Sequence, residues 1–117
     1  MNQQNDITAP VDAQFAAYNA RDIEAFVASY AADVHLATFP GASYCEGRQA
    51  LRERYASLFE RNPALRAELI NRMVVPPYVT DHERVTGLVG RAPLEALAIY
   101  ELRNGLIQSV WFIQREG

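Results

Sequence analysis

Apolar residues recur at intervals of three and four positions in three segments of the first half of the chain. They are Val11, Phe15 and Tyr18 in the first segment, Ile23, Phe26, Val27 and Tyr30 in the second, and Leu51, Tyr55, Leu58 and Phe59 in the third. This spacing places each set on one face of a helix. Thr8 and Asp22 precede the first two segments as candidate N-caps, and Gly47 opens the third. We therefore predict three helices in this half.

The second half of the chain has the pattern of strands separated by turns. Strands are predicted at residues 33–39, 78–86, 94–102 and 106–114. Pro40 with Gly41 ends the first of them, and Asn104 with Gly105 is a strong hairpin signal between the last two. The sequence thus predicts helices followed by a meander of strands.

Residues 64–75 fit two patterns. Leu65, Leu69 and Met73 have helical spacing after Pro63, a favourable first helical residue. The same segment also alternates apolar and charged residues, as a half-buried strand does. Local signals leave both assignments open.

The last predicted hairpin is apolar on both faces. Before its turn, Ala96, Ala98, Tyr100 and Leu102 oppose Leu97 and Ile99, and after it, Val110 and Phe112 oppose Ile107, Trp111 and Ile113. A single layer of helices covers only one face of a sheet. We therefore expect the second face to form a homodimer interface that includes Trp111, Ile99 and Leu97. The alternative is that Trp111 packs against the C-terminus of its own chain.

Composition favours one soluble domain over residues 1–117, with residues 1–7 as a polar tail. Half of the 117 residues are hydrophobic, which is enough for a core. Cys45 is the single cysteine, which excludes an internal disulfide and indicates a reducing compartment. No segment has the pattern of a signal peptide or a membrane span, so we expect a cytoplasmic protein. The net charge of -3 provides no basic surface for nucleic acid.

Three short motifs occur in order along the chain. They are Tyr18-Asn19-Ala20-Arg21-Asp22, Ala32-Asp33-Val34 and Glu46-Gly47-Arg48-Gln49-Ala50-Leu51-Arg52-Glu53-Arg54-Tyr55. With these motifs and its order of elements, the chain resembles the NTF2-like superfamily, which includes ketosteroid isomerases and SnoaL-like polyketide cyclases. The resemblance implies an α+β cone, in which three N-terminal helices pack on a curved antiparallel (mixed) sheet around an apolar pocket. It also implies that residues 64–75 form a strand, and that dimers form through the convex face of the sheet.

The catalytic residues of ketosteroid isomerases do not carry over to this chain. In that family an aspartate base works with a tyrosine and a protonated aspartic acid that bind the enolate oxygen. Without gaps, the position of the base falls on Thr38 or Phe39, that of the tyrosine near Gln14 and that of the acid near Ala98. None of these side chains can perform the corresponding role, so the resemblance does not imply that mechanism.

Asp81, His82 and Glu83 form a polar triplet within an otherwise apolar predicted strand. Because side chains alternate along a strand, either His82 or the two acids face the pocket. An inward His82 would titrate near neutrality and transfer protons. Inward acids would have raised pKa values, and one could act as a base. A solvent-exposed position for all three is a third option, and the pattern leaves the choice open.

The candidate site residues are His82 and Asp81 for proton transfer, and Tyr55, Tyr100, Asn71, Thr38, Phe112 and Gln14 for ligand binding. Tyrosine hydroxyls and amide groups in an apolar cavity commonly orient small ligands. We expect no cofactor, and no metal because the spacing of His35 and His82 does not suggest a shared site. The expected function is binding of a small apolar or amphipathic molecule, with isomerisation, cyclisation or hydration by acid-base chemistry. The alternative is a non-catalytic dimeric ligand-binding or interaction module.

Overall fold

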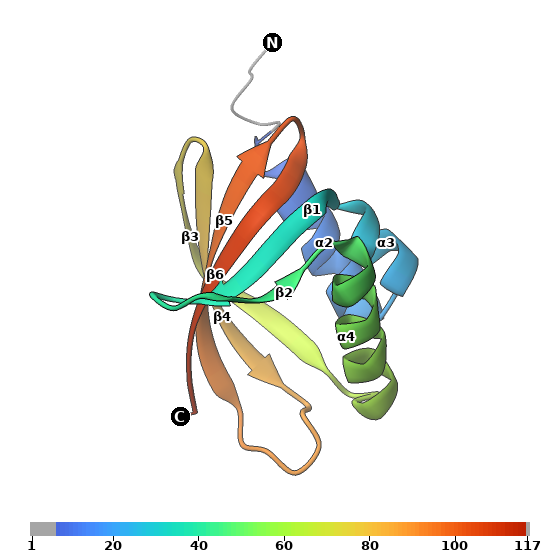
Figure 1. Cartoon of the computed structure of the whole chain (residues 1–117). Helices are drawn as coiled ribbons and strands as arrows, with labels where there is room; N and C mark the ends of the chain where they lie inside the picture. The colour runs from blue at the N-terminus through green and yellow to red at the C-terminus, as the bar shows by residue number, and fades with distance from the viewer. Residues whose placement is uncertain (1–6, 117) are drawn as a thin grey trace.

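Within residues 7–116, which the computed structural model describes, helices pack against one face of a curved six-stranded sheet (Figure 1). The helices are α2 (Ala9–Ala20), α3 (Ile23–Ala28) and α4 (Arg48–Arg61). The strands are β1 (Tyr30–Thr38), β2 (Ser43–Glu46), β3 (Arg66–Val75), β4 (Tyr78–Thr86), β5 (Leu94–Arg103) and β6 (Leu106–Glu116). The predicted α+β architecture is confirmed. Most of the predicted polar tail lies outside the described residues, and Ile7 packs against the core.

The helix boundaries follow from local chemistry. Pro10 lies in the first turn of α2, where its missing N–H removes no helical hydrogen bond. Arg21 ends α2 in the left-handed conformation, and Asp22 caps α3 by accepting a hydrogen bond of 3.2 Å from the backbone N–H of Ala25. None of the helices described in residues 7–116 is long and apolar enough to cross a membrane.

The sheet has the strand order β2-β1-β6-β5-β4-β3. Neighbouring strands are antiparallel except β1 and β6, which are parallel. The predicted turn at Asn104 and Gly105 joins β5 to β6, and both residues have positive φ as a tight hairpin turn requires. The sheet is therefore mixed, with the long C-terminal hairpin at its centre.

The structure assigns one segment that the sequence left open and differs from the sequence prediction in two others. Residues 66–75 form β3, so the strand assignment of this segment is correct. Tyr30 was assigned to the second helix but begins β1, because α3 ends at Ala28 and is only six residues long. The short strand β2 was not predicted, since four residues are too few for a clear alternation.

The outer face of the sheet, turned away from the helices, carries many apolar side chains. Met73, Ile99 and Trp111 lie in one row across β3, β5 and β6, with Thr80 of β4 between the first two. Leu97 and Ile113 are cross-strand partners on the same face and are 36% and 40% exposed. The hairpin is thus apolar on both sides, as its sequence predicted. The prediction for Ile107 was wrong, because the register shift between Glu101 and Leu102 leaves Ile107 buried in the core rather than on the outer face.

Gly87 directly follows β4 and lies against the segment between α4 and β3. It has a φ of 84°, and a Cβ atom there would overlap the carbonyl group of Ala64, which precedes β3. Two residues later, the Val89 N–H donates a hydrogen bond of 2.8 Å to Asn62 Oδ1. The connection between β4 and β5 is therefore held against the segment that follows α4.

Substitution of Gly87 by alanine should destabilise the fold more than the same change at Gly90. Both glycines have positive φ, but nothing lies near a Cβ at Gly90. We expect Gly90→Ala to lower the free energy of unfolding by about 1 kcal/mol and Gly87→Ala by about 3 kcal/mol. Urea unfolding of both variants measures the difference. Equal losses would contradict the described contact between residues 64 and 87.

Candidate functional site

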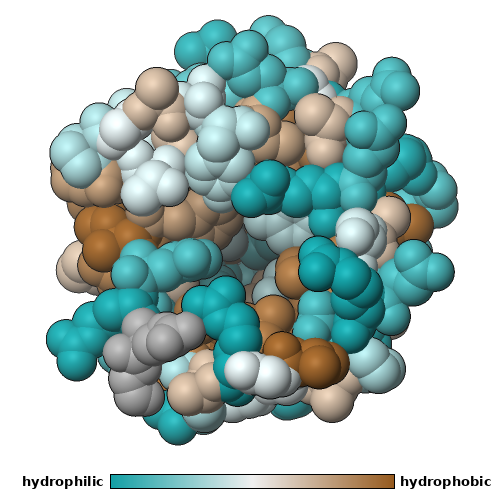
Figure 2. All heavy atoms as spheres, turned by 60° about the horizontal axis from the view of Figure 1, so that its bottom comes forward, coloured by the Kyte–Doolittle hydropathy of each residue, from teal (hydrophilic) through white to brown (hydrophobic). Residues whose placement is uncertain are grey.

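A cavity of about 680 Å³ lies between the helices and the inner face of the sheet. Side chains from α2, α3, α4 and the strands line it. The face at the bottom of Figure 1 is hollowed near its middle, as the space-filling view shows (Figure 2). The volume is in the range of small-molecule binding sites.

Aromatic rings form the helical side of the cavity. The ring centroids of Phe26 and Tyr55 lie 4.5 Å apart, and Tyr18 meets Phe59 edge-on at 5.6 Å. Burial raises the pKa of the Tyr18 and Tyr55 hydroxyls, so both remain protonated. Within residues 7–116 neither hydroxyl has a hydrogen-bond partner. Both are therefore available to a ligand.

Gln14 connects two further tyrosines at the inner end of the cavity. It is buried, and its Oε1 accepts a hydrogen bond of 3.1 Å from the Tyr30 hydroxyl. Its Nε2 donates to the Tyr100 hydroxyl at 3.0 Å and to the Val11 carbonyl at 3.1 Å. Tyr100 is thus an acceptor for Gln14, which leaves its own hydroxyl hydrogen free to donate to a ligand.

Glu83 places a carboxyl group in this aromatic cavity. It lines the cavity from β4, is 8% exposed, and has no hydrogen bond or ion pair among the described residues. Burial, with a smaller contribution from the charge of Asp81, raises the pKa of Glu83 to about 7, although Arg72 opposes the shift. Burial raises the pKa of the Tyr18, Tyr30 and Tyr100 hydroxyls, which line the same cavity, and the charge of Glu83 adds to each shift. Near neutral pH both protonation states of Glu83 are populated.

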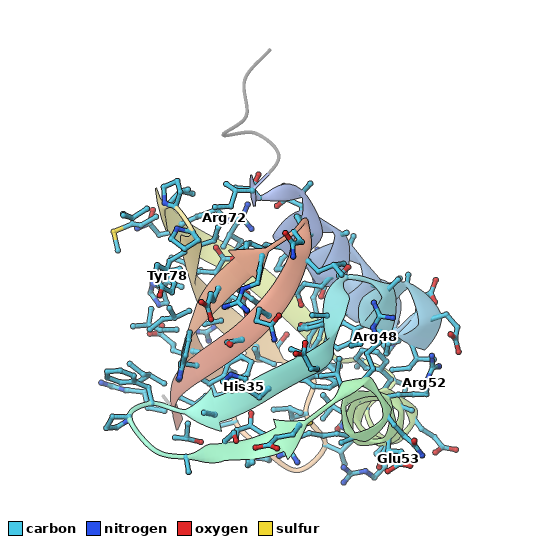
Figure 3. The ribbon with its side chains drawn as sticks, turned by 45° about the horizontal axis from the view of Figure 1, so that its top comes forward. His35, Arg48, Arg52, Glu53, Arg72 and Tyr78 are labelled. Carbon is cyan, nitrogen blue, oxygen red and sulfur yellow. The ribbon has the colours of Figure 1, made fainter. Side chains whose placement is uncertain are left out.

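Asp81 points to the same face as Glu83 but is fully paired. Arg72 on β3 donates to its two oxygens, at 2.7 Å from Nε and 2.9 Å from Nη2. A third nitrogen, Nη1, lies 2.7 Å from Asp12 on α2, toward which Arg72 extends (Figure 3). These hydrogen bonds raise the pKa of Arg72 and keep it charged. The fully buried Asp81 is thus held by a bidentate ion pair, whereas Glu83 is not.

A family model of SnoaL-like domains matches residues 11–110, which is most of the chain. The chain belongs to the SnoaL-like domain family. The resemblance inferred from the three sequence motifs is thereby confirmed, and with it the NTF2-like fold. No protein of curated function matches the sequence.

Solved structures share the fold of this SnoaL-like domain. An uncharacterized cystatin-fold protein from Novosphingobium aromaticivorans superposes with a TM-score of 0.84 at 29% identity, covering 92% of this chain and 97% of that one. A candidate polyketide cyclase from Sinorhizobium meliloti has a TM-score of 0.79 at 19% identity, covering 96% and 100%. A candidate ketosteroid isomerase from Kribbella flavida has a TM-score of 0.81 at 19% identity, covering 100% and 83%. At 19% identity the likeness shows the fold alone.

The cavity of the SnoaL-like domain contains some of the residues that the sequence singled out. Gln14, Tyr55, Tyr100 and Phe112 line it. Asn71 is exposed on the outer face of the sheet, where it is the cross-strand neighbour of His82. Thr38 is exposed at the end of β1 and does not line the cavity.

The structure also decides how the polar triplet of β4 is oriented. Asp81 and Glu83 face inward, and His82 faces outward, where its Nε2 lies 3.3 Å from Glu95 Oε1. Glu83 is the acid that lines the cavity, although the sequence had placed Asp81 and His82 first. Its alternation with Val79 and Val85, both buried, was the signal that could have found it.

The second histidine lies away from the cavity. His35 contacts Ser109 Oγ at 2.9 Å and meets the Trp111 ring edge-on at 6.2 Å. Within the part of the chain that the structure describes, no three His, Cys, Asp or Glu side chains are grouped to hold a metal ion. Cys45 is buried, and burial raises the pKa of its thiol.

The raised pKa of Glu83 should appear as a pH dependence of stability. The folded protein holds this proton more tightly than the unfolded chain, so the contribution of Glu83 to stability falls as pH rises from about 4.5 to about 7. Glu83→Gln removes this loss. As pH rises across that range, the free energy of unfolding of the variant, measured in urea, should increase relative to that of the wild type by on the order of 3 kcal/mol.

Glu95→Gln is the matched control, because Glu95 is an exposed glutamate on the adjacent strand. For each variant, the difference in free energy of unfolding from the wild type is compared across pH. If this difference changes with pH no more for Glu83→Gln than for Glu95→Gln, burial does not perturb Glu83.

Proposed function

We propose that this domain binds a small, largely apolar molecule in its cavity and transfers a proton on it, with Glu83 as the acid-base group. The observation that carries the proposal is an unpaired carboxyl group inside an aromatic cavity. A catalytic acid-base group works best when its pKa lies near the working pH, and burial brings the pKa of Glu83 to about 7. The structural neighbours described as a candidate polyketide cyclase and a candidate ketosteroid isomerase support the same class of chemistry.

The proton transfer is an isomerisation at a carbon next to a carbonyl group. Ionised Glu83 accepts the proton, and the electron pair of the broken C–H bond moves to the carbonyl oxygen to form an enolate. The protonated carboxyl group then returns the proton to another atom of the conjugated system. No other reactant is consumed, and the carboxyl group ends in its starting state.

Tyrosine hydroxyls supply the hydrogen bonds that an enolate oxygen needs. Tyr100 and Tyr18 line the same cavity as Glu83, and neither hydroxyl hydrogen has an acceptor among residues 7–116. A hydroxyl that is already in place stabilises the charge on oxygen without reorganisation. Gln14 positions Tyr100, and the rings around Phe26 and Tyr55 hold the apolar body of the ligand.

Deuterium exchange into 2-tetralone in D2O tests this step directly. The C1 hydrogens of this bicyclic ketone are activated by the ring and the carbonyl group, and proton NMR follows their loss. We expect the domain to accelerate exchange over buffer, with a rate that rises with pH through about 7 as Glu83 ionises. Glu83→Gln should lower the enzymatic rate by about 100-fold or more.

Control variants test whether the exchange takes place in the cavity or on the outer surface. Glu95→Gln and His82→Ala alter the outer face of the sheet and should retain the wild-type rate. Tyr100→Phe should retain binding and lower the rate. Binding of 2-tetralone with no accelerated exchange in the wild type would contradict proton transfer and favour a non-catalytic binding protein.

We also propose that two copies of the chain associate through the outer face of the sheet. The apolar row of Met73, Ile99 and Trp111 and the exposed pair Leu97 and Ile113 support this assembly. The helices cover the opposite face, so the cavities of both copies would remain open. An exposed apolar surface of this kind is unfavourable in a monomer in water.

Light scattering after size-exclusion chromatography should give twice the 13.1 kDa mass of the chain. The double variant Leu97→Glu with Ile113→Glu places two charges on the shared face and should elute as a monomer with an unchanged circular dichroism spectrum. A wild type that remains monomeric at about 100 μM, where even weak interfaces associate, would contradict the assembly.

A further inference from the structure

The opening of the cavity differs in chemistry from its interior. The exposed polar residues that line it are Glu53, Arg54, Ser57, Arg61, Arg91 and Gln114. Hydrophilic side chains gather around the hollow in the space-filling view (Figure 2). Among the described residues, three arginines and one glutamate thus line the opening of a chain whose net charge is -3. Positive charge is concentrated where a ligand would enter.

Arg54 and Arg61 lie on the same face of α4. Seven residues correspond to two helical turns, so their side chains leave the helix in the same direction, about 10 Å apart along its axis. Ser57 and Leu58 occupy the turn between them and also line the cavity. Arg91 lines the cavity from the connection between β4 and β5. The guanidinium groups of α4 therefore follow one edge of the opening.

Both arginines of α4 retain unused hydrogen-bond donors. Arg54 packs its guanidinium over the Tyr44 ring at 4.5 Å, and Arg61 uses only Nε, which contacts Ser57 Oγ at 3.1 Å. In residues 7–116 neither of them forms an ion pair, whereas Arg52 of the same helix is paired with Glu24. Glu53 also projects from α4, and Gln49 contacts it at 3.4 Å (Figure 3). The Arg54 and Arg61 side chains are thus held in place and still able to bind an anion.

The interior dictates which end of a ligand lies at the opening. Ionised Glu83 would repel a second negative charge, and the rings around it offer no cation to balance one. An anionic group is therefore unfavourable deep in the cavity and favourable at its edge. The guanidinium fork matches the two oxygens of a carboxylate.

We propose that the natural ligand is an amphipathic oxyanion, whose carboxylate or similar group binds Arg54 and Arg61 while its apolar body lies among the rings. This inference rests on the proposed function, because it assigns a ligand class to the same cavity. It also fixes the orientation of the ligand, with the reacting carbon directed at Glu83 and the charged end directed at solvent.

Three probes with one body and different end groups test the inference by calorimetry at pH 7.5. They are 3-(2-naphthyl)propanoate, 3-(2-naphthyl)propan-1-ol and 3-(2-naphthyl)propan-1-amine. We expect the propanoate to bind about tenfold more tightly than the alcohol, because charge-assisted hydrogen bonds at the opening add to the same apolar contact. The preference should shrink when NaCl is raised from about 20 mM to about 300 mM.

Two double variants test whether Arg54 and Arg61 cause the preference for the propanoate. The double variant Arg54→Gln with Arg61→Gln should bind propanoate and alcohol with nearly equal affinity and retain the wild-type affinity for the alcohol. The matched control is Arg66→Gln with Arg84→Gln, which removes two arginines that do not line the cavity. It should keep the preference for the propanoate.

The outcomes distinguish the proposed ligand class from the proposed function. Equal binding of propanoate and alcohol to the wild type, or tighter binding of the amine, would overturn the anionic ligand class and leave the apolar cavity intact. A preference that survives in the Arg54 and Arg61 variant would also overturn it. Failure of all three probes to bind would overturn both the ligand class and the proposed function.

Discussion

One carboxyl group inside a cavity lined by aromatic rings is the constraint on which this structure's chemistry depends. Water stabilises an ionised carboxylate far better than ring faces do, and Glu83 forms no ion pair among the described residues, while the charge of Arg72 offsets only part of the cost of burial. Its ionised and neutral forms are consequently close in free energy near neutral pH. A group in that position can both accept and return a proton, which a surface glutamate does poorly at the same pH.

The architecture of the sheet explains why Asp81 is paired with a cation and Glu83 is not. Strand alternation puts Asp81 and Glu83 on the same inner face, two residues apart. β3 carries Arg72 opposite Asp81, so the guanidinium group is committed to that acid and to Asp12 of α2. Breaking the buried Arg72–Asp81 pair is costly, which keeps the guanidinium group on Asp81, whereas Asp12 is exposed and holds it less strongly. Glu83 is thereby left as the inward acid without a pairing cation.

The sequence predicted the fold more fully than the site. Helical spacing, the turn at Asn104 and Gly105, and the family motifs were sufficient for the architecture because each depends on residues close together in the chain. The inward direction of Glu83 depends on which face of β4 meets the helices, and the pairing of Asp81 depends on Arg72 nine residues away on another strand. Asn71 was misjudged because the irregularity between Leu69 and Asn71 reverses the alternation of β3.

The titration of the Glu83 carboxyl carbon by carbon-13 NMR tests the central claim most directly. In protein labelled at the glutamate side chains, the resonance that disappears in Glu83→Gln belongs to this residue. Burial without a cationic partner predicts a midpoint near pH 7. A midpoint at or below about pH 5, close to that of an ordinary glutamate, would mean that water or a cation reaches the carboxylate and would contradict the account.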